Sequence, residues 1–461
     1  MSLRLFDSKN RAVRDFVPVE PGKVSMYVCG ITVQGPPHIG HMRVAVAFDV
    51  VRRWLIRTGY DVTMIRNVTD IDDKILIKAA EHNDDWWKWA YRYELVATAA
   101  YNTLGVLPPS YEPRATGHIT EMIDLIAELI DRGHAYESGG DVYFDVASWP
   151  RYGELTGMKV DELQPAADTD NDSKKRDVRD FALWKGQKAS EPASASWPTP
   201  WGRGRPGWHL ECSAMARRYL GSGFDIHGGG IDLRFPHHEN EIAQSCAAGD
   251  EFAQYWMHNA WVTLAGEKMS KSLGNTLSID ELTKNARPVD LRFYLATVHY
   301  RSTVDFSESS LAEARAAYDR IEGFIGRADV AGDISTVALP DGFVSAMNDD
   351  INVSGAMAVV YDAVRHGNSA LASGDKARAR ELALQVRAML DVLGLDPLSE
   401  QWVDCAESQT ADLGWAIDDL LAQRTEARAA KDFARADAIR DTLTAHGISI
   451  EDTPDGPKWS R

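Results

Sequence analysis

The sequence predicts an α/β protein with a parallel sheet that is split by an insertion and followed by helices and a small C-terminal α+β module. The first observation is an apolar run at 24–28, a loop rich in Gly and Pro, and an apolar-periodic segment at 42–57 that stops at Gly59, a pattern of strand, loop and helix. The second is a helical period that continues from Phe343 to Leu395. The third is the length of 461 residues, which exceeds one compact core and predicts roughly two to four domains.

The loop before the first helix carries His38 and His41, whose spacing puts both imidazoles on one side of the helix start. Because the first backbone N–H groups of a helix lack helical partners and the dipole there is positive, we expect this loop to hold a phosphate. The alternative is a Pro-Pro turn with two incidental histidines. Residues 61–66 predict the next parallel strand, which leaves Cys29 and Thr69 at the carboxyl edge of the sheet, where ligands bind.

Helices are expected next at about 73–81 and 84–104. The second of them carries the aromatic residues Trp86, Trp87, Trp89, Tyr91 and Tyr93. They resemble a stacking surface for nucleic-acid bases, but on a helix of this length we favour core and interface packing.

An insertion is predicted after an amphipathic helix at 119–132 that Gly133 ends. It contains a strand at 141–146, a charged stretch at 168–177 and a region rich in Gly, Pro and Ser that extends to Pro206. We expect the charged stretch to be a solvated loop.

The interrupted fold resumes at Trp208, with a helix from about His209 that carries Cys212. A short strand at 224–227 then leads into a Gly-rich turn, Gly228-Gly229-Gly230, and Asp232. Glycines allow a close approach of backbone to ligand, and an acidic residue just beyond can accept hydrogen bonds from ribose hydroxyls. This pattern indicates a nucleotide site.

A helix is predicted from Pro236, with proline at the favoured first position. His237 and Glu241 share one face of it. Together with two cysteines at element ends they form a credible tetrahedral zinc set. Spacing leaves open the choice between His237 and His238, and Cys246 as a third sulfur. The alternative is two buried thiols and a surface His/Glu pair.

A lysine-rich loop at 267–275 alternates Lys with small hydroxyl residues, which suits a polyphosphate. An exposed polar loop is the alternative. Ser278 and Glu281 then form a capping box, and helices are expected at 288–299 and 311–327.

The last module follows a polar linker at 396–410. We expect helices at 413–430 and 432–446, and two short strands at 448–451 and 457–459. An unbroken helix would align Arg424, Arg428, Lys431 and Arg435 as one basic stripe, whereas Asp432 as an N-cap would bend it. The residues from 424 to 461 are neutral in a strongly acidic chain, so we expect RNA contact here, with Trp459 as the aromatic candidate.

Composition limits the functional classes. The chain has 50 basic and 68 acidic residues and a net charge of −18, which argues against indiscriminate nucleic-acid binding. Four cysteines are too few for a disulfide framework, which favours metal ligation or burial. No window of the sequence resembles a membrane span or a signal peptide, so we expect a cytoplasmic protein.

Two runs resemble signatures of the class I aminoacyl-tRNA synthetases. His38-Ile39-Gly40-His41 resembles the HIGH motif, and Lys268-Met269-Ser270-Lys271-Ser272 resembles the KMSKS motif. Three further runs are similar to cysteinyl-tRNA synthetase: residues 27–33, 66–74 and 207–215. The resemblance covers almost the whole chain. Residues 34–37 depart from the family's pattern, and we assign them no role.

The resemblance implies a Rossmann-type class I synthetase catalytic domain with an insertion, a helical bundle and an anticodon-binding module. The expected domains are 1–112 and 207–250 (the two halves of the catalytic domain), 113–206 (connective insertion), 251–318 (KMSKS-bearing stem-contact region), 319–398 (helical bundle) and 399–461 (anticodon-binding module).

The resemblance also implies the site residues. The zinc ligands would be Cys29, Cys212, His237 and Glu241, with one Zn²⁺ per chain. Catalysis would involve His38, His41, Lys268 and Lys271. ATP, with Mg²⁺, would contact His38, Gly40, His41, Gly228, Gly229, Asp232 and Lys271. Cysteine would contact Gly30, Thr32, Thr69, Trp208 and His227.

The function implied is a cysteine–tRNA ligase that activates L-cysteine with ATP and transfers it to tRNA(Cys). Zinc would select the substrate thiolate. We expect a monomer without membrane contact. The rival function is a cysteine ligase of the mycothiol pathway, with an amino-sugar acceptor and without the full C-terminal module. A non-catalytic RNA-binding protein would have no need of the two phosphate signatures.

Overall fold

The computed structural model describes residues 2–158, 172–264, 266–268, 277–403, 420–425, 427–428, 432–445, 449–453 and 456–460. Two compact units are present, Met1–Asp396 and Pro397–Arg461.

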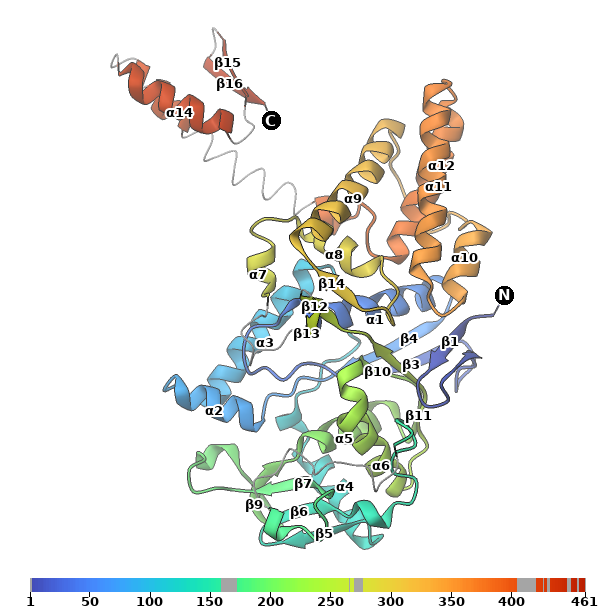
Figure 1. Cartoon of the computed structure of the whole chain (residues 1–461), viewed down its shortest axis with the longest axis vertical. Helices are drawn as coiled ribbons and strands as arrows, with labels where there is room; N and C mark the ends of the chain where they lie inside the picture. Colours follow the sequence, from blue (N-terminus) through green and yellow to red (C-terminus); the bar gives the residue numbers. More distant parts are fainter. Residues whose placement is uncertain are drawn as a thin grey trace. The chain divides into compact units, whose positions relative to one another are not determined.

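A four-stranded parallel sheet forms the centre of the first unit (Figure 1). Its order is β11 (Phe252–Asn259), β10 (Gly223–Gly230), β3 (Lys23–Val28) and β4 (Asp61–Arg66). The chain runs outward from β3 to β4 on one side and from β10 to β11 on the other. The carboxyl ends of β3 and β10 therefore flank the switch point at which open α/β sheets bind ligands. The predicted α/β class is confirmed.

Helix α1 (Ile39–Arg57) connects β3 to β4 and packs closely on the sheet. A Cβ atom at Gly228 would lie 2.3 Å from the Phe48 ring of α1, so glycine is needed where β10 meets this helix. The predicted Gly-rich turn is wrong in this respect, because Gly228, Gly229 and Gly230 continue strand β10.

The segment after β4 forms α2 (Asp73–Glu81), α3 (Trp86–Thr103) and α4 (Ile119–Asp131). On α3, Trp86 and Trp89 are buried, whereas Trp87 and Tyr91 are 53% and 52% exposed. The predicted core packing is therefore confirmed for Trp86 and Trp89, whereas Trp87 and Tyr91 lie on the solvent face of α3.

The insertion contains a five-stranded antiparallel sheet, of which the sequence predicted one strand. Its order is β5 (Ala135–Ser138), β6 (Asp141–Phe144), β7 (Phe181–Gly186), β9 (Gly202–Pro206) and β8 (Trp197–Thr199). Figure 1 shows this sheet in green on one side of the parallel sheet, with the helical region in orange on the other. Helices α5 (Trp208–Leu220) and α6 (Glu239–Ala247) lie between the two sheets. In the sequence α5 precedes β10, and α6 lies between β10 and β11.

The remaining elements of the first unit are mostly helical: β1 (Arg4–Asp7), β2 (Ala12–Asp15), β12 (Val262–Leu264), β13 (Glu267–Lys268), β14 (Val304–Phe306), α7 (Ile279–Leu282), α8 (Pro288–Ala296), α9 (Glu308–Ala328), α10 (Asp341–Asn348), α11 (Val353–Ala372) and α12 (Lys376–Val392). A buried ion pair joins α1 to α8, because Arg292 Nη2 lies 2.5 Å from Asp49 Oδ2. The same guanidinium donates to the carbonyl oxygen of Leu393, just beyond α12.

The second unit contains α14 (Phe433–Ala445) and the antiparallel pair β15 (Ser449–Thr453) and β16 (Gly456–Ser460). The Asp432 carboxylate accepts a hydrogen bond from the Arg435 backbone N–H at 3.1 Å, so Asp432 caps this helix. The unbroken basic stripe is wrong for a further reason, since Arg424 is buried. Lys431 lies outside the described residues, as does the side chain of Trp459.

No α-helix in the described part of the chain has the length and apolar character needed to cross a membrane.

Candidate active site and metal centre

The start of α1 presents His38 and His41 as a stacked pair, with ring centroids 3.7 Å apart. Each Nδ1 atom accepts a backbone hydrogen bond: His38 Nδ1 from the Gly40 N–H at 3.1 Å, and His41 Nδ1 from the His38 N–H at 3.2 Å. In a neutral imidazole whose Nδ1 accepts, the proton lies on Nε2. Both rings are thus held in the tautomer that donates from Nε2.

The expectation that the backbone N–H groups at this helix start are unpaired is wrong. The Ile39 N–H donates to the Leu277 carbonyl oxygen at 3.0 Å, and the Gly40 N–H is bound by His38 Nδ1. The N–H groups of His41 and Met42 donate to the His38 carbonyl oxygen. The first-turn amides of α1 are thus already paired within the protein.

The lysine-rich loop is described only at its ends. Lys268 pairs in β13 with Thr263, and an isolated bridge joins Ser278 to His38. Residues 269–276, including Lys271, and the side chain of Lys268 lie outside the described part of the chain. One end of the loop thus pairs with β12, and the other end is bonded to the start of α1.

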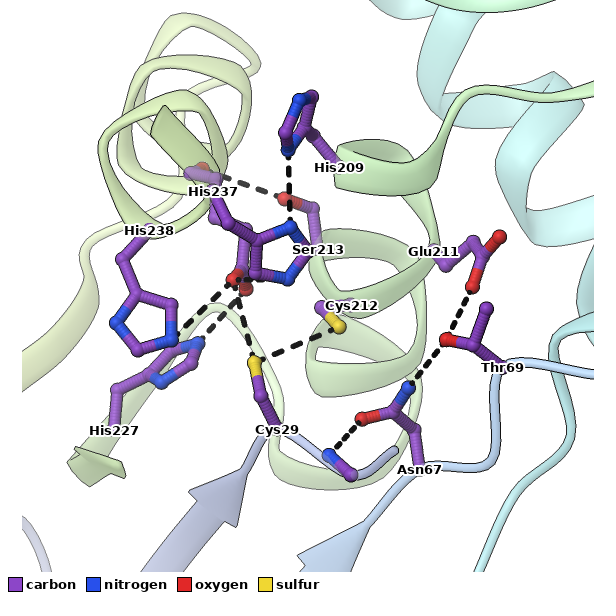
Figure 2. A network of polar contacts seen from close by, with 12 residues as sticks. Cys29, Asn67, Thr69, His209, Glu211, Cys212, Ser213, His227, His237 and His238 are labelled. Carbon is purple, nitrogen blue, oxygen red and sulfur yellow. Dashed lines mark hydrogen bonds and ion pairs between the residues drawn. The ribbon is translucent and has the colours of Figure 1, made fainter. Parts of the chain in front are cut away.

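A buried cluster of Cys29, Cys212, His237 and Glu241 lies at the end of β3, and Figure 2 shows its polar contacts. Cys29 Sγ lies 3.7 Å from Cys212 Sγ and 3.5 Å from Glu241 Oε1, and His237 Nε2 lies 3.1 Å from the same oxygen. The donor atoms of all four residues lie within 4.8 Å of one another. The alternative of a surface His/Glu pair is wrong, because both residues are buried. The cluster can hold a metal ion.

Local structure brings these four residues together from three elements. Cys29 directly follows β3, and its N–H donates to the Gly228 carbonyl oxygen at 3.0 Å. Cys212 lies in the second turn of α5. His237 lies in the segment Arg234–His238 that runs directly into α6. In this segment only Phe235 has non-helical backbone angles, so helical backbone continues from Pro236 into α6, as predicted. The predicted shared face of His237 and Glu241 is confirmed by their 3.1 Å contact.

Further histidines surround the cluster. His227 Nε2 lies 2.8 Å from Glu241 Oε2, and His209 Nδ1 lies 3.0 Å from His237 Nδ1. His238 Nε2 is 4.0 Å from Glu241 Oε1. A second group able to hold a metal therefore overlaps the first, formed by Cys29, His227, His238 and Glu241. In the described part of the chain, Cys246 belongs to neither group.

Burial sets the protonation of this cluster. It raises the pKa of the Cys29 thiol well above its usual range, with the hydrogen bond and the charge of Cys212 adding to the effect. It lowers the pKa of His237 to about 3, as it does for His209. His237 is therefore neutral near pH 7, which is the form of imidazole that binds a metal.

The residues predicted to contact cysteine line the same edge. Thr32 and Thr69 form an isolated parallel bridge, which ties the loop after Cys29 to the end of β4. Trp208 stacks on His237 with ring centroids 4.2 Å apart. Gly30 and His227 lie beside the cysteines, so the structure brings all five together with the metal-capable cluster.

Three of the predicted nucleotide residues, Gly228, Gly229 and Asp232, lie on β10 or just beyond it. Gly228 and Gly229 are buried, and added Cβ atoms would meet Phe48 and the His238 ring, at 2.3 and 2.8 Å. Asp232 is exposed just beyond the end of β10. The two glycines are explained by packing, and their contact with ATP stays a prediction.

Three family models match the chain. They are described as the tRNA synthetases class I (C) catalytic domain at residues 15–316, the DALR domain at 342–397 and the cysteinyl-tRNA ligase anticodon binding domain at 410–459. The chain is also 58% identical to the cysteine–tRNA ligase of Beutenbergia cavernae, over 100% of this chain and 99% of that protein. It is 57% identical to that of a Nocardioides species, over the full length of both.

The chain belongs to the cysteine–tRNA ligase family. Solved structures of other synthetases share its fold. Methionyl-tRNA synthetase of Mycobacterium tuberculosis in complex with methionyl-adenylate matches with a TM-score of 0.58 at 14% identity, covering 82% of this chain and 90% of that one. LeuRS of Agrobacterium radiobacter, solved as a ternary complex with tRNA, matches with 0.59 at 12% identity, covering 85% and 86%. At these identities the likeness supports the fold alone.

Sequence reasoning in this member of the cysteine–tRNA ligase family missed Asn67, His209 and Glu211. All three lie within the family-like runs 66–74 and 207–215. No spacing or composition distinguishes them, because their contacts join residues that are distant in sequence.

Proposed function

We propose that Cys29, Cys212, His237 and Glu241 hold one zinc ion that selects the amino acid. As a member of the cysteine–tRNA ligase family, the chain activates L-cysteine with ATP, releases pyrophosphate and transfers cysteine to the 3′ end of tRNA(Cys). The observation that carries the zinc proposal is the buried donor set with two sulfurs at the end of β3.

The distances in this set fit a tetrahedral zinc ion. Usual zinc–ligand distances put two sulfur ligands about 3.8 Å apart, a sulfur and an oxygen about 3.6 Å apart, and a nitrogen and an oxygen about 3.4 Å apart. The corresponding distances here are 3.7, 3.5 and 3.1 Å. A mixed set of thiolate, imidazole and carboxylate is also the donor chemistry that zinc accepts.

The overlapping group fits less well. Its contact of 2.8 Å between His227 Nε2 and Glu241 Oε2 is a hydrogen bond in which the ring nitrogen carries the proton. A protonated nitrogen is not a metal ligand, so His227 instead orients the Glu241 carboxylate. This favours His237 over His238 as the imidazole ligand.

His209 supports the same choice. If His237 binds through Nε2, its Nδ1 carries the proton and donates to His209 Nδ1 at 3.0 Å. Because burial keeps His209 neutral, its Nδ1 is available as the acceptor. The pair thus fixes the ring of His237 with Nε2 facing the cysteines.

A bound zinc ion would favour a soft thiolate over a hydroxyl, which is the only difference between cysteine and serine. Apolar contact alone separates such similar side chains poorly. The chain's own contribution is to hold the two thiols, the imidazole and the carboxylate in place, while Trp208 covers His237.

The phosphate side of the reaction is proposed at α1. His38 and His41 hold the tautomer that donates from Nε2, which suits the oxygens of ATP. Lys268 and Lys271 would approach from the loop whose C-terminal end is bonded to this helix start. Mg²⁺ would enter with ATP, and Gly40, Gly228, Gly229 and Asp232 would complete the nucleotide contacts.

The second unit is proposed to bind the anticodon of tRNA(Cys). The family model for the anticodon-binding domain matches residues 410–459. The amino-sugar ligases are expected not to have this module in complete form. That favours tRNA over an amino-sugar as acceptor. We also propose a cytoplasmic location, because reducing compartments keep thiols such as Cys29 and Cys212 free to bind metal. The monomeric state stays a prediction.

The test is cysteine-dependent exchange of pyrophosphate into ATP, followed by transfer to tRNA(Cys) or to an amino-sugar. We expect exchange with cysteine and transfer to tRNA alone. Exchange without transfer to tRNA, or transfer to the amino-sugar, would contradict the proposal.

A further inference from the structure

The proposed metal ligands His237 and Glu241 are separated by three residues that are not in the proposed ligand set. All three are buried, and each is bonded to a part of the chain outside α6: His238 to His258 on β11, Glu239 to the turn at 153–156, and Asn240 to Tyr152. Two of these three residues are bonded to the insertion. The start of α6 is therefore attached to the insertion directly beside the two ligands.

The carboxyl group of Glu239 receives most of this attachment. Its Oε1 accepts from the Gly153 N–H at 2.9 Å and from the Leu155 N–H at 3.4 Å, and its Oε2 accepts from the Thr156 N–H at 2.9 Å. The Thr156 hydroxyl lies 2.9 Å from the same Oε2 atom. Backbone N–H groups that converge in a turn form a concavity suited to a carboxyl group. These four contacts are called the Glu239 latch below.

The direction of the three backbone bonds is independent of the protonation of Glu239. Burial raises the pKa of this carboxyl, and the bonds from the turn oppose that effect. A backbone N–H can only donate, however, so both carboxyl oxygens must accept in either protonation state. A nitrogen in place of either oxygen would leave at least one of the N–H groups without its acceptor.

The turn that supplies these donors is itself fixed. Gly153 has a φ of +93°, and a Cβ atom there would lie 2.1 Å from the Met158 carbonyl oxygen, so the turn needs glycine at this position. On the other side, Arg11 Nη2 donates to the Thr156 carbonyl oxygen at 2.6 Å. The turn is thus bonded to the segment between β1 and β2 as well as to α6, and it can hold Glu239 in place.

The position of α6 matters for a metal because a tetrahedral site tolerates only small displacements of its ligands. A helix of 9 residues such as α6 depends on tertiary contacts for its stability. His237 precedes this helix and Glu241 lies in its first turn, with Glu239 midway between them. A shift of the helix start would therefore change the 3.1 Å approach of His237 Nε2 to Glu241 Oε1.

We propose that Glu239 is a positioning residue of the metal centre, which locks the insertion onto the start of α6 and thereby sets the spacing of His237 and Glu241. The assignment rests on the proposed function, in which these two residues hold zinc. It gives the insertion a role in metal binding, although the insertion supplies none of the four proposed ligands.

The test compares the full-length wild type with Glu239→Gln and Glu154→Gln. Gln has the size of Glu, but its amide nitrogen must face either the Thr156 N–H or the N–H groups of Gly153 and Leu155, which breaks the latch. Glu154→Gln is the matched control. It makes the same substitution in the same turn, at a carboxylate that lies 3.1 Å from Lys9 Nζ and outside the latch.

Zinc affinity is measured by competition with a chromogenic chelator, and the geometry of the site by the visible absorption of the cobalt(II)-loaded protein. We expect Glu239→Gln to lower zinc affinity by about 10- to 100-fold, the usual effect of removing a group that orients a ligand, and to weaken the cobalt(II) bands. Glu154→Gln should leave zinc affinity within about twofold, because it removes a pair near the surface. A merely structural role would lower the Tm of the zinc-free protein and leave the cobalt(II) bands of the folded protein unchanged.

Unchanged zinc affinity and unchanged cobalt(II) bands in folded Glu239→Gln overturn the inference, as does an equal effect of Glu154→Gln. If Glu239→Gln does not fold, the decision rests on Thr156→Val, which removes the hydroxyl contact of the latch and leaves the backbone bonds in place. It should lower zinc affinity by about threefold or more, the scale of one hydrogen bond, and Thr156→Ser should restore it. Equal affinities in these two variants and the wild type also overturn the inference.

Failure of the proposed function would give a different result. A wild type that binds no zinc, or that binds it no better than Cys212→Ala, would contradict the proposed ligand set, so the two failures are distinguishable.

Discussion

At the scale of single residues, Glu241 is the point at which the polar groups of the site meet. One carboxylate oxygen faces Cys29 and His237, and the other accepts from His227. The orientation of a proposed ligand is therefore set by His227, which is not itself in the proposed ligand set. The same holds for His237, whose ring is oriented by His209.

Replacing Cys212 by Ala should remove the zinc. The change deletes one of two sulfurs and leaves a three-ligand set, so elemental analysis should find much less than one zinc ion per chain. Cys246→Ala is the matched control, since in the described part of the chain this thiol belongs to no metal-capable group. Full zinc content in the first variant, or loss in the second, would show that the ligand set is wrong.

At the scale of elements, α1 connects the nucleotide side of the site to the helices beyond it. Its start is bonded to Leu277 and Ser278 at the end of the lysine-rich loop. Its middle is bonded through Asp49 to α8. A movement of that loop would therefore be transmitted to the backbone of His38.

Lys271→Ala should slow the formation of the adenylate by on the order of 10²-fold or more, because a positioned charge on the departing pyrophosphate acts mainly in the transition state. Single-turnover kinetics measure this step directly. Normal activation combined with weaker ATP binding would mean that Lys271 only holds the nucleotide.

Asp49→Asn should destabilise the first unit by about 3–5 kcal/mol, the usual cost of leaving one charge of a buried pair without its partner. The variant leaves Arg292 buried without its counter-charge. Urea unfolding measures the difference. Asp362→Asn is the control, because its pair with Arg365 is exposed and should contribute at most about 1 kcal/mol.

The pH dependence of this pair follows from the pKa of Asp49. Burial alone would raise the pKa, but the charges of Arg292 and Arg53 outweigh it and hold the pKa below its usual range. A carboxyl with a depressed folded pKa contributes stability above its unfolded pKa, near about 3.9, and loses it as the pH falls through the folded value. The destabilisation by Asp49→Asn should thus be constant between about pH 5 and 7. An increase towards acid would contradict this sign.

The sequence predicted the elements that carry a strong period or a motif. The strand before Cys29, the helix after His38 and the face shared by His237 and Glu241 follow from local spacing. Most of the insertion sheet was missed because its strands are short, and because β7 pairs with β6 and β9 across long connections. The Gly228–Gly230 run was misassigned because Gly228 is required by its contact with Phe48, a residue distant in sequence.

At the scale of the whole molecule, the chain divides after Asp396, between the unit with the proposed activation site and the unit that matches the anticodon-binding model. Each unit has its own buried cluster, including Leu421, Ile439 and Leu443 in the second. Activation and tRNA recognition are expected to be separable.

A chain that ends at Asp396 should keep cysteine-dependent pyrophosphate exchange within about threefold, while kcat/KM for tRNA(Cys) should fall by at least about 100-fold, because several RNA contacts of about 1–3 kcal/mol are removed together. The comparison is made with the full-length chain under the same salt. Equal charging by both would mean that the second unit does not read the anticodon.

The central claim is that a metal at Cys29, Cys212, His237 and Glu241 distinguishes cysteine from serine. The most direct measurement is the dissociation constant of each amino acid, by equilibrium dialysis, with zinc-loaded and with zinc-stripped protein. An apolar pocket alone would discriminate by at most about 10²-fold. We predict a preference for cysteine above about 10³-fold in the loaded protein, and a loss of cysteine affinity on stripping that leaves serine unchanged. An undiminished preference in the stripped protein would contradict the account.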